Sequence, residues 1–513
     1  MPSATELVWP IAQSGITVSW DPDSTRLGQG PRRSAAYFQV HIPYEPLTTP
    51  RIAEDEEGIR YPVASDLQPR LAVAWEPADD YRVWTVHLRR GVRSNWGNEL
   101  NAECVRWSWE RVYHLKQVGY WRSCYLAGLA SIDDLEILDD YTLRFHLSRS
   151  NPAFPQYLIF ATNNIVDATE AKRHATPDDP WAVAWLSDHP AGFGPFTLDH
   201  QTPTSLHFRS RDDFWAGRPP LTRITQLGVS TREQAFRLLE RGEANFLLGL
   251  YPDEYPRFLH RPGYRLIRTR ANHATLEFNW LAPPFDDQRV RQAICYALPY
   301  ARIWQDVYHG YARPSYSPIP SVSACSTAEF WPYTTDLERA RALLAASAYP
   351  AGFEVPLYIQ PSAESLRFGE VVRESLLALG IRVEVRVQTS LPVGTKVPLW
   401  FKEECGHALY EPLYDLAHDY DPPPGMWGGK NIVAAQWQER LRAVREAPSW
   451  TQAEGYRALQ RELLEFAPCA HIAEIETGWV VREPVTEWVL GPWFLGAQTC
   501  VWSTHRQMLG GWW

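Results

Sequence analysis

Apolar residues follow two different periods within one stretch of the chain, residues 276–298. The first part alternates apolar and polar positions, which predicts a half-buried strand; its apolar residues are Leu276, Phe278 and Trp280. A Pro-Pro pair then breaks regular structure, and Asp286 or Asp287 can cap a helix after it. The apolar residues of that helix fall on one stripe: Val290, Ala293, Ile294, Ala297 and Leu298. The stretch therefore predicts a strand, a turn and an amphipathic helix.

The same two periods recur along the chain and predict alternating strands and helices. Period-2 segments predict strands at 71–76, 83–89, 196–198, 205–208 and 245–248, and two short strands within 135–147. Helical spacing predicts helices after Asn101 and at 231–241, 336–347 and 452–467. Strand 355–359, helix 362–379 and strand 381–386 follow one another, which is the order of a βαβ unit. We therefore expect an α/β fold.

Five blocks, found in order along nearly the whole chain, carry a family resemblance. They are WTVHLRRGVRSNWGNELNAECVRWSWER at 84–111, the Gly-Phe-Gly-Pro-Phe to Phe-Trp-Ala-Gly block at 192–217, LLERGEAN at 238–245, LEFNWLAPPFDDQRVRQAICYAL at 276–298 and DLAHDYDPPPGMW at 415–427. In these blocks the chain resembles the solute-binding proteins of peptide-type ABC importers, family 5, also called the oligopeptide/dipeptide-binding group. It departs from the family pattern at Cys104, where the family has Asp, and at Trp96, where it has Asn or Asp.

The resemblance implies a two-lobed α/β fold of the periplasmic-binding-protein type, enlarged by an extra subdomain. Lobe one would be built from three segments, at 1–50, 190–268 and 478–513. Residues 51–189 would form the extra subdomain, and residues 269–477 would form lobe two. Proteins of this type hold a ligand between the lobes and close over it like a clamp.

The function that the resemblance implies is capture of a small peptide or similar solute and its delivery to an ABC permease. Such a protein works outside the cytoplasm, in the periplasm or at the cell surface, and we expect it to be a monomer. It needs neither a cofactor nor a metal, because a closed cleft with a few oriented polar groups and aromatic faces holds a solute without chemistry. The sequence contains no recognisable catalytic motif, so an enzyme is not expected.

The block at 415–427 supplies the first candidate ligand contacts. It resembles a family loop in which the Asp before Tyr pairs with the α-amine of a peptide, and Asp419 and Tyr420 take those positions. An ammonium–carboxylate bond in a closed cleft would be strong. The block departs from the family at Asp415-Leu416, where Gly-Trp is usual, and at His418, where Ala is usual. The alternative is that Asp419 caps a helix or bonds the backbone of its own loop.

Tryptophan and asparagine supply the other candidates. Trp96 and Trp427 lie in segments that face the ligand in relatives, and aromatic faces suit a sugar, an aromatic side chain or a cation. Asn279 and Trp280, at the end of the strand that enters lobe two, are further candidate ligand contacts. The alternative for the aromatic candidates is structural packing, because the chain has 24 tryptophans and most must be core or surface.

Charge, hydropathy and cysteine content narrow the possible partners. The formal net charge is −10 and basic residues are dispersed, which argues against nucleic acid as a partner. There is no apolar run of 18 residues, so no spanning segment is expected. The N-terminal residues do not read as a secretory signal, and the seven cysteines form no Cys-x-x-Cys pair. An alternative therefore stays open: a cytoplasmic enzyme or ligand sensor of the same fold, with candidate cleft residues Cys405, Asp415, His418 and Asp419.

Overall fold

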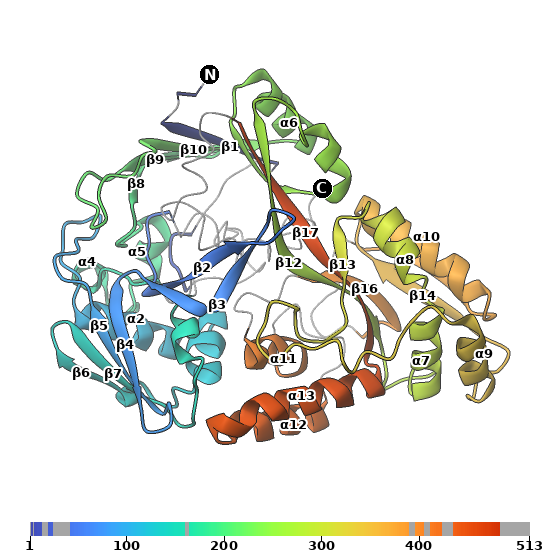
Figure 1. The fold of residues 1–513 in the computed structure, drawn as a ribbon. Helices are drawn as coiled ribbons and strands as arrows, with labels where there is room; N and C mark the ends of the chain where they lie inside the picture. Colours follow the sequence, from blue (N-terminus) through green and yellow to red (C-terminus); the bar gives the residue numbers. More distant parts are fainter. Residues whose placement is uncertain are drawn as a thin grey trace. The chain divides into compact units, whose positions relative to one another are not determined.

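The computed structural model describes residues 2–3, 5–12, 19–23, 42–159, 164–388, 396–404, 411–422 and 434–482 (Figure 1). The chain divides into two compact units. Unit 1 comprises Met1–Leu250, Tyr255–Ile267 and Gly478–Trp502, and unit 2 comprises Tyr251–Glu254, Arg268–Thr477 and Ser503–Trp513. The division of the chain into lobe one, an extra subdomain and lobe two stays a prediction.

Unit 1 contains two four-stranded sheets. The first has the order β1-β10-β9-β8, with β1 parallel to β10 and the other pairs antiparallel. Its strands are β1 (Glu6–Ala12), β8 (Phe196–Thr202), β9 (Ser205–Ser210) and β10 (Arg223–Val229). The second is antiparallel, with the order β4-β5-β7-β6, and its strands are β4 (Ala72–Ala78), β5 (Val83–Leu88), β6 (Leu135–Asp139) and β7 (Thr142–His146).

Helix α2 (Ala102–Leu115) packs on the second of these sheets. Asn101 caps it by accepting a hydrogen bond from the amide of Cys104, as its sequence position predicts. Trp109 of α2 meets Phe145 of β7 edge to face, with ring centroids 5.6 Å apart. An aromatic contact of this kind buries a large apolar area, so the Trp-rich face of α2 forms the core of this part of unit 1.

The other elements of unit 1 are a β-ribbon and short helices. The ribbon is β2 (Thr48–Glu54) with β3 (Ile59–Pro69), and β11 (Phe246–Leu250) pairs with the last residues of β17. Helix α6 (Arg232–Arg241) is capped by Thr231 and ends at Gly242, whose φ of +73° suits glycine. The short helices are α3 (Val118–Tyr120), η1 (Trp121–Leu126), η2 (Ile132–Asp134), η3 (Phe154–Ile159), α4 (Ala168–Ala171), η5 (Lys172–His174) and α5 (Val183–Asp188); η6 (Pro252–Arg257) begins at the unit boundary.

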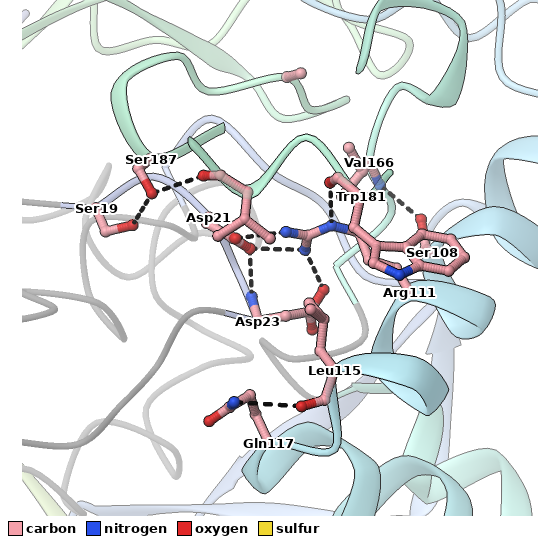
Figure 2. Close-up of polar contacts among 12 residues, drawn as sticks. Ser19, Asp21, Asp23, Ser108, Arg111, Leu115, Gln117, Val166, Trp181 and Ser187 are labelled. Atoms are coloured by element: carbon pink, nitrogen blue, oxygen red, sulfur yellow. Dashed lines mark hydrogen bonds and ion pairs between the residues drawn. The ribbon is translucent and has the colours of Figure 1, made fainter. Parts of the chain in front are cut away.

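A buried arginine joins α2 to the segment around residue 21 (Figure 2). The guanidinium of Arg111 is fully buried and bonds both carboxylate oxygens of Asp21 and one oxygen of Asp23. Its Nε donates to the carbonyl oxygen of Trp181 at 2.9 Å. Four hydrogen bonds thus leave the guanidinium of Arg111, and the two carboxylates are held in place with little access to solvent.

Unit 2 is built around a mixed sheet in which strand order β17-β12-β16-β14-β15 departs from chain order. Its strands are β12 (Tyr264–Phe278), β13 (Ala312–Pro314), β14 (Glu354–Ile359), β15 (Arg382–Val387), β16 (Leu399–Glu404) and β17 (Cys469–Arg482). The boundary between the units falls within β12 and within β17. Strands β14 and β15 are parallel, with Leu357 beside Val385, and α10 (Ala363–Leu377) connects them. The predicted βαβ unit is confirmed.

Helix α7 (Gln288–Ala297) shows why the helical part of residues 276–298 folds as predicted. The strand before it, predicted as half-buried, instead ends at Phe278 and is buried on both faces. Asp287 caps α7 by accepting from the amide of Arg289, and the apolar stripe of α7 lies in the hydrophobic core of unit 2 together with α9 (Leu337–Ala345) and α10. The remaining helices of unit 2 are α8 (Tyr300–Arg302), η7 (Ile303–Val307), α11 (Pro412–Tyr420), α12 (Ala435–Glu446) and α13 (Ser449–Phe466). Burial of the stripe, at about 25 cal/mol per Å² of apolar surface, stabilises this arrangement.

Arg291 lies on the other side of α7 and is 1% exposed. Its guanidinium donates to the carbonyl oxygens of Phe285 at 2.7 Å, Phe466 at 2.6 Å and Ala467 at 3.0 Å. Phe466 and Ala467 end α13, where carbonyl groups have no partner within the helix. Arg291 therefore ties the turn before α7 to the C-terminal end of α13, and burial lowers its pKa to about 10.

Candidate ligand-binding site

Strand β12 is buried on both of its faces within unit 2. Ala274, Leu276 and Phe278 belong to the hydrophobic core. Because side chains alternate along a strand, His273, Thr275 and Glu277 point to the opposite face, and all three are at most 5% exposed. We call these three residues the polar face of β12. A strand that buries polar side chains on one whole face is unusual, because each buried polar group needs a hydrogen-bond partner.

The neighbouring strand β16 supplies a charge to this face. Lys402 is the register partner of Thr275, and its Nζ lies 3.7 Å from an oxygen of Glu277 with both side chains buried. Among the residues that the structure describes, none is a hydrogen-bond partner of the Thr275 hydroxyl. The same holds for the side-chain carbonyl oxygen of Asn279, which follows the strand and is 9% exposed. An unmatched buried polar group costs about 1–3 kcal/mol, so these two atoms are places where a ligand would gain affinity.

Helix α11 is buried along its whole length. Glu411 begins it, with its two carboxylate oxygens accepting from the amides of Leu413 at 3.0 Å and Tyr414 at 2.8 Å, and Pro412 occupies the first turn. The sequence comparison placed this segment in a loop, and that interpretation is wrong for residues 412–420, because the cap and the first-turn proline start a helix. Glu411, not Asp419, caps α11, and Asp419 lies in its last turn.

The carboxylates of α11 differ in their surroundings. Asp415 is fully buried and accepts from the hydroxyl of Ser323 at 2.7 Å. Burial raises the pKa of Asp415 to about 8, which the Ser323 hydrogen bond and the nearby His273 only partly offset, so this group is largely neutral near pH 7. Asp419 is 3% exposed, and one of its oxygens lies 3.6 Å from Nδ1 of the adjacent His418.

A second carboxylate group reaches this region from β17. Glu474 lies 3.3 Å from Nε2 of His273 and accepts from the amide of Ser321 at 2.6 Å and its hydroxyl at 2.5 Å. Burial raises the pKa of Glu474, but the hydrogen bonds from His273 and Ser321 together bring it below its usual range. Glu474 is therefore a buried carboxylate whose ionised form is supported by its neighbours.

These residues form one electrostatically linked group, which we call the α11 cluster. Its members are His273, Ser321, Ser323, Asp415, His418, Asp419 and Glu474. The charges of His273, His418 and Asp419 all influence the pKa of Asp415, which links the β-strand half of the cluster to the helix half. Within the described residues no group of three or more His, Cys, Asp or Glu side chains has the arrangement of a metal site. Oriented carboxylates beside imidazoles suit a ligand with an ammonium group.

The candidates predicted from sequence fall in different places. Asp419 and Tyr420 are adjacent on α11, and the buried ring of Tyr420 lies 6.4 Å from that of Trp437. Trp280 is buried and packs edge to face against Phe466, with ring centroids 5.1 Å apart. This contact is the structural packing given above as the alternative to ligand binding. Trp427 and Cys405 lie outside the described residues.

Trp96 belongs to unit 1 and is 45% exposed. Its ring lies 5.4 Å from that of Trp185, and its Nε1 donates to the carbonyl oxygen of Pro190 at 2.9 Å. One face of Trp96 is thus used for packing, while much of the side chain stays accessible. A role for it in ligand binding stays a prediction.

Sequence reasoning did not single out the strand and loop members of the α11 cluster, His273, Ser321, Ser323 and Glu474. His273 had a usable signal, because it stands two residues before Thr275 in the same period-2 pattern. Glu474 and the serines had none, since their partners lie more than 90 residues away in the chain.

Comparison with protein families decides the identity of the fold. Residues 66–431 match the model of the bacterial extracellular solute-binding proteins, family 5, middle region. This chain belongs to that family. The two-lobed periplasmic-binding-protein type of α/β fold expected from sequence is thereby confirmed, as is the resemblance from which it was inferred.

Relatives of this family-5 chain include binding proteins with different ligands in their names. Heme-binding protein A of Haemophilus influenzae is 28% identical over 354 residues, covering 65% of this chain and 63% of the relative. The dipeptide-binding protein of Escherichia coli is 25% identical over 346 residues, covering 63% of each chain. The match thus spans less than two thirds of the length of these curated relatives.

Solved structures agree with the family-5 fold over nearly the whole chain. A dipeptide-binding protein of Pseudoalteromonas in complex with Met-Leu has a TM-score of 0.74 at 18% identity, covering 93% of this chain and 96% of that one. The periplasmic binding protein DppA of Helicobacter pylori, in complex with the peptide STSA, has a TM-score of 0.72 at 20% identity, with 93% and 94% covered. In the part of this family-5 chain that the structure describes, every helix is too short or too polar to cross a membrane.

Proposed function

We propose that this family-5 protein captures a small peptide or a similar solute outside the cytoplasm and presents it to an ABC permease. It does so as a monomer, in the periplasm or at the cell surface, and by binding alone. The observation that supports this most is the buried polar surface of unit 2. Thr275 and Asn279 bury polar atoms that no group in the described part of the chain satisfies, and a solute rich in hydrogen-bonding groups would satisfy them.

Asp419 is the proposed partner of the ligand's ammonium group. It takes the position at which the family pairs a carboxylate with the α-amine of a peptide, and it is 3% exposed. A carboxylate in the last turn of a helix faces the negative end of the helix dipole, which does not favour it. A ligand cation at this place would relieve that repulsion, which gives Asp419 a reason to be where it is.

Native mass spectrometry of the purified protein, followed by thermal-shift measurements, tests the function. The solutes are dipeptides and tripeptides, oligosaccharides and amino-acid derivatives. We expect a non-covalent adduct or a Tm rise that saturates with solute concentration, since a ligand that binds only the folded state stabilises it. Absence of binding across these solutes, or conversion of a solute to product, would overturn the transport proposal.

Paired variants and paired ligands then test the site. For a peptide that binds, Asp419→Asn should abolish most of the Tm rise, whereas Asp133→Asn, whose side chain is 90% exposed, should leave it unchanged. The same peptide with an acetylated N-terminus should stabilise the wild type little. If Asp419→Asn keeps the full response to the free peptide, Asp419 does not bind the amine, although the protein still binds the peptide.

A further inference from the structure

Unit 2 contains a pocket with aromatic walls, separate from the residues of the α11 cluster. Its volume is about 420 Å³, which is within the range of small-molecule sites. Five aromatic side chains line it, together with alanine and threonine, and the lining contains no charged residue. We call this cavity the aromatic pocket. Its aromatic lining residues are Tyr300, Trp304, Tyr316, Trp331 and Tyr333.

Three of the rings stand at steep angles to the ring of Trp331. Trp331 is central: its centroid lies 5.9 Å from Tyr300 at 77°, 5.8 Å from Tyr316 at 56° and 5.4 Å from Tyr333 at 81°. Rings that stacked flat would hide their faces from one another. Rings at these angles instead form walls, so that a guest in the pocket meets several of them at once.

The polar ends of these rings are used inside the protein. The hydroxyls of Tyr300 and Tyr333 donate to the carbonyl oxygens of Cys295 at 3.0 Å and Leu464 at 2.8 Å. Trp304 and Trp331 donate from Nε1 to the carbonyl oxygens of residues 472 and 333, at 2.8 Å and 2.5 Å. What these four rings offer to a guest is therefore their π-surface. A sugar or an anion, which needs hydrogen-bond donors, would find few here.

Arginines occupy aromatic faces close to the pocket but leave the pocket rings uncovered. Arg339 lies 4.3 Å from the ring centroid of Tyr296, and Arg461 lies 4.3 Å from that of Phe330, the residue before Trp331. Among the residues that the structure describes, no Lys or Arg lies over any of the five rings of the aromatic pocket. Ring faces in this part of unit 2 thus attract cations, and those of the pocket are left for a guest.

We propose that the aromatic pocket binds a small organic cation, of the class of methylated or quaternary ammonium compounds. Several ring faces around one cation give cation–π attraction, and methyl groups on the nitrogen add apolar contact with the same walls. A quaternary nitrogen has no hydrogen-bond donor, which matches a lining that offers few acceptors. The net charge of −10 favours the approach of a cation. This site is additional to the proposed solute site and does not depend on it.

Isothermal titration of the full chain with choline and with its neutral isostere 3,3-dimethyl-1-butanol tests the proposal. The two compounds have the same shape and hydroxyl, so their difference isolates the charge. We expect choline to bind about tenfold more tightly than the isostere, the size of effect that a desolvated cation–π contact gives. Equal affinity, or tighter binding of the isostere, would overturn the proposal in favour of simple apolar binding, and no binding of either would overturn it outright.

Single substitutions test whether choline binds in the aromatic pocket. Tyr316 is 39% exposed, so Tyr316→Ala should fold normally and should weaken choline binding about fivefold, by loss of one ring face. Tyr316→Phe keeps the face and should bind choline as the wild type does. Trp450, which is 76% exposed and outside the pocket, provides the matched control: Trp450→Ala should change nothing.

Asp419→Asn separates this proposal from the proposed solute site. Choline binding should persist in that variant, because no lining residue of the pocket belongs to the α11 cluster. If Asp419→Asn abolishes choline binding while Tyr316→Ala leaves it intact, the cation binds at the α11 cluster and the aromatic-pocket proposal fails, although the proposed function stands.

Discussion

Each unit of this protein contains a buried arginine that links distant segments of that same unit. The two arginines bind different kinds of partner. Arg111 in unit 1 is 0% exposed and bonds two carboxylates. Arg291 in unit 2 is 1% exposed and bonds four backbone carbonyls, those of residues 285, 286, 466 and 467. Both side chains are anchored on a helix and reach a distant segment. The difference is that the partners of Arg111 are charged and those of Arg291 are not.

The pKa values of the two sites show what this difference means. Burial lowers the pKa of both arginines, but at Arg111 the charges of Asp21 and Asp23 outweigh burial and raise the pKa above its usual value. At Arg291 the nearby charges raise the pKa less than burial lowers it, and the pKa falls to about 10. The carboxylate site carries a surplus negative charge, and burial raises the pKa of Asp23 to about 7. Arg111 is therefore needed for charge balance, while Arg291 is needed for hydrogen bonding.

The largest effect is expected from Arg111→Met. This variant leaves two carboxylates buried without their counter-charge, and breaking a buried ion pair from one side costs about 3–5 kcal/mol of unfolding free energy. Chemical denaturation at neutral pH would measure the loss.

The charge explanation has its own control. Adding Asp21→Asn and Asp23→Asn to Arg111→Met removes the buried charges and should restore a substantial part of the lost stability. If the triple variant is no more stable than the single one, the cost comes from lost packing and hydrogen bonds, and the contrast between the two arginines disappears.

A smaller effect is expected from Arg291→Met. It leaves only neutral carbonyls without donors, and the variant no longer pays for a buried charge, so we expect a loss of about 2 kcal/mol. Arg289 stands two residues earlier on α7 with its side chain 51% exposed, and Arg289→Met is the matched control. It should cost far less stability than Arg291→Met, because solvent screens an exposed charge. Equal losses for Arg111→Met and Arg291→Met would show that partner charge does not matter here.

The same two arginines show how far sequence carries a fold prediction. The sequence predicts Asn101 as a helix cap and Asp286 or Asp287 as another, and the structure shows Asn101 and Asp287 in these positions. The apolar stripe of α7 is predicted from its spacing, because caps and periodicity are local signals. The partners of the arginines were not found. Asp21 is 90 residues from Arg111, and Ala467 is 176 residues from Arg291, and no local pattern connects such positions.

The candidate site, like the fold, is predicted from the sequence only in part. Asp419 and Tyr420 came from family resemblance, and whether they touch a ligand stays a prediction. Helix α11 differs from the loop that the resemblance implies, although Glu411-Pro412 is a local signal for a helix start. Glu474 and Ser321 join the cluster only through strand order and a long connection, which periodicity along one segment does not contain.

The smallest effect, and the most direct measure of the surplus charge at Arg111, is the pH dependence of stability. The folded pKa of Asp23 is about 7, above its ordinary value of 3.8, so the folded protein holds this proton more tightly than the unfolded chain does. Stability from this group is therefore full below about pH 4 and falls as pH rises towards 7. Each pH unit over which only the folded state holds the proton corresponds to about 1.4 kcal/mol. The folded pKa of about 7 already includes the charge of Arg111, so we expect a loss of about 1.4 kcal/mol between pH 6 and pH 8.

Asp23→Asn, which removes the titrating group, should lose less stability over that interval than the wild type. Denaturation of both proteins at the two pH values measures the difference, in which the titration of Asp415 cancels because both proteins retain it. Parallel pH profiles would mean that Asp23 stays ionised beside Arg111 across the whole interval. Arg111 would then face two ionised carboxylates at every pH of the interval, and the surplus negative charge of the site would not depend on pH.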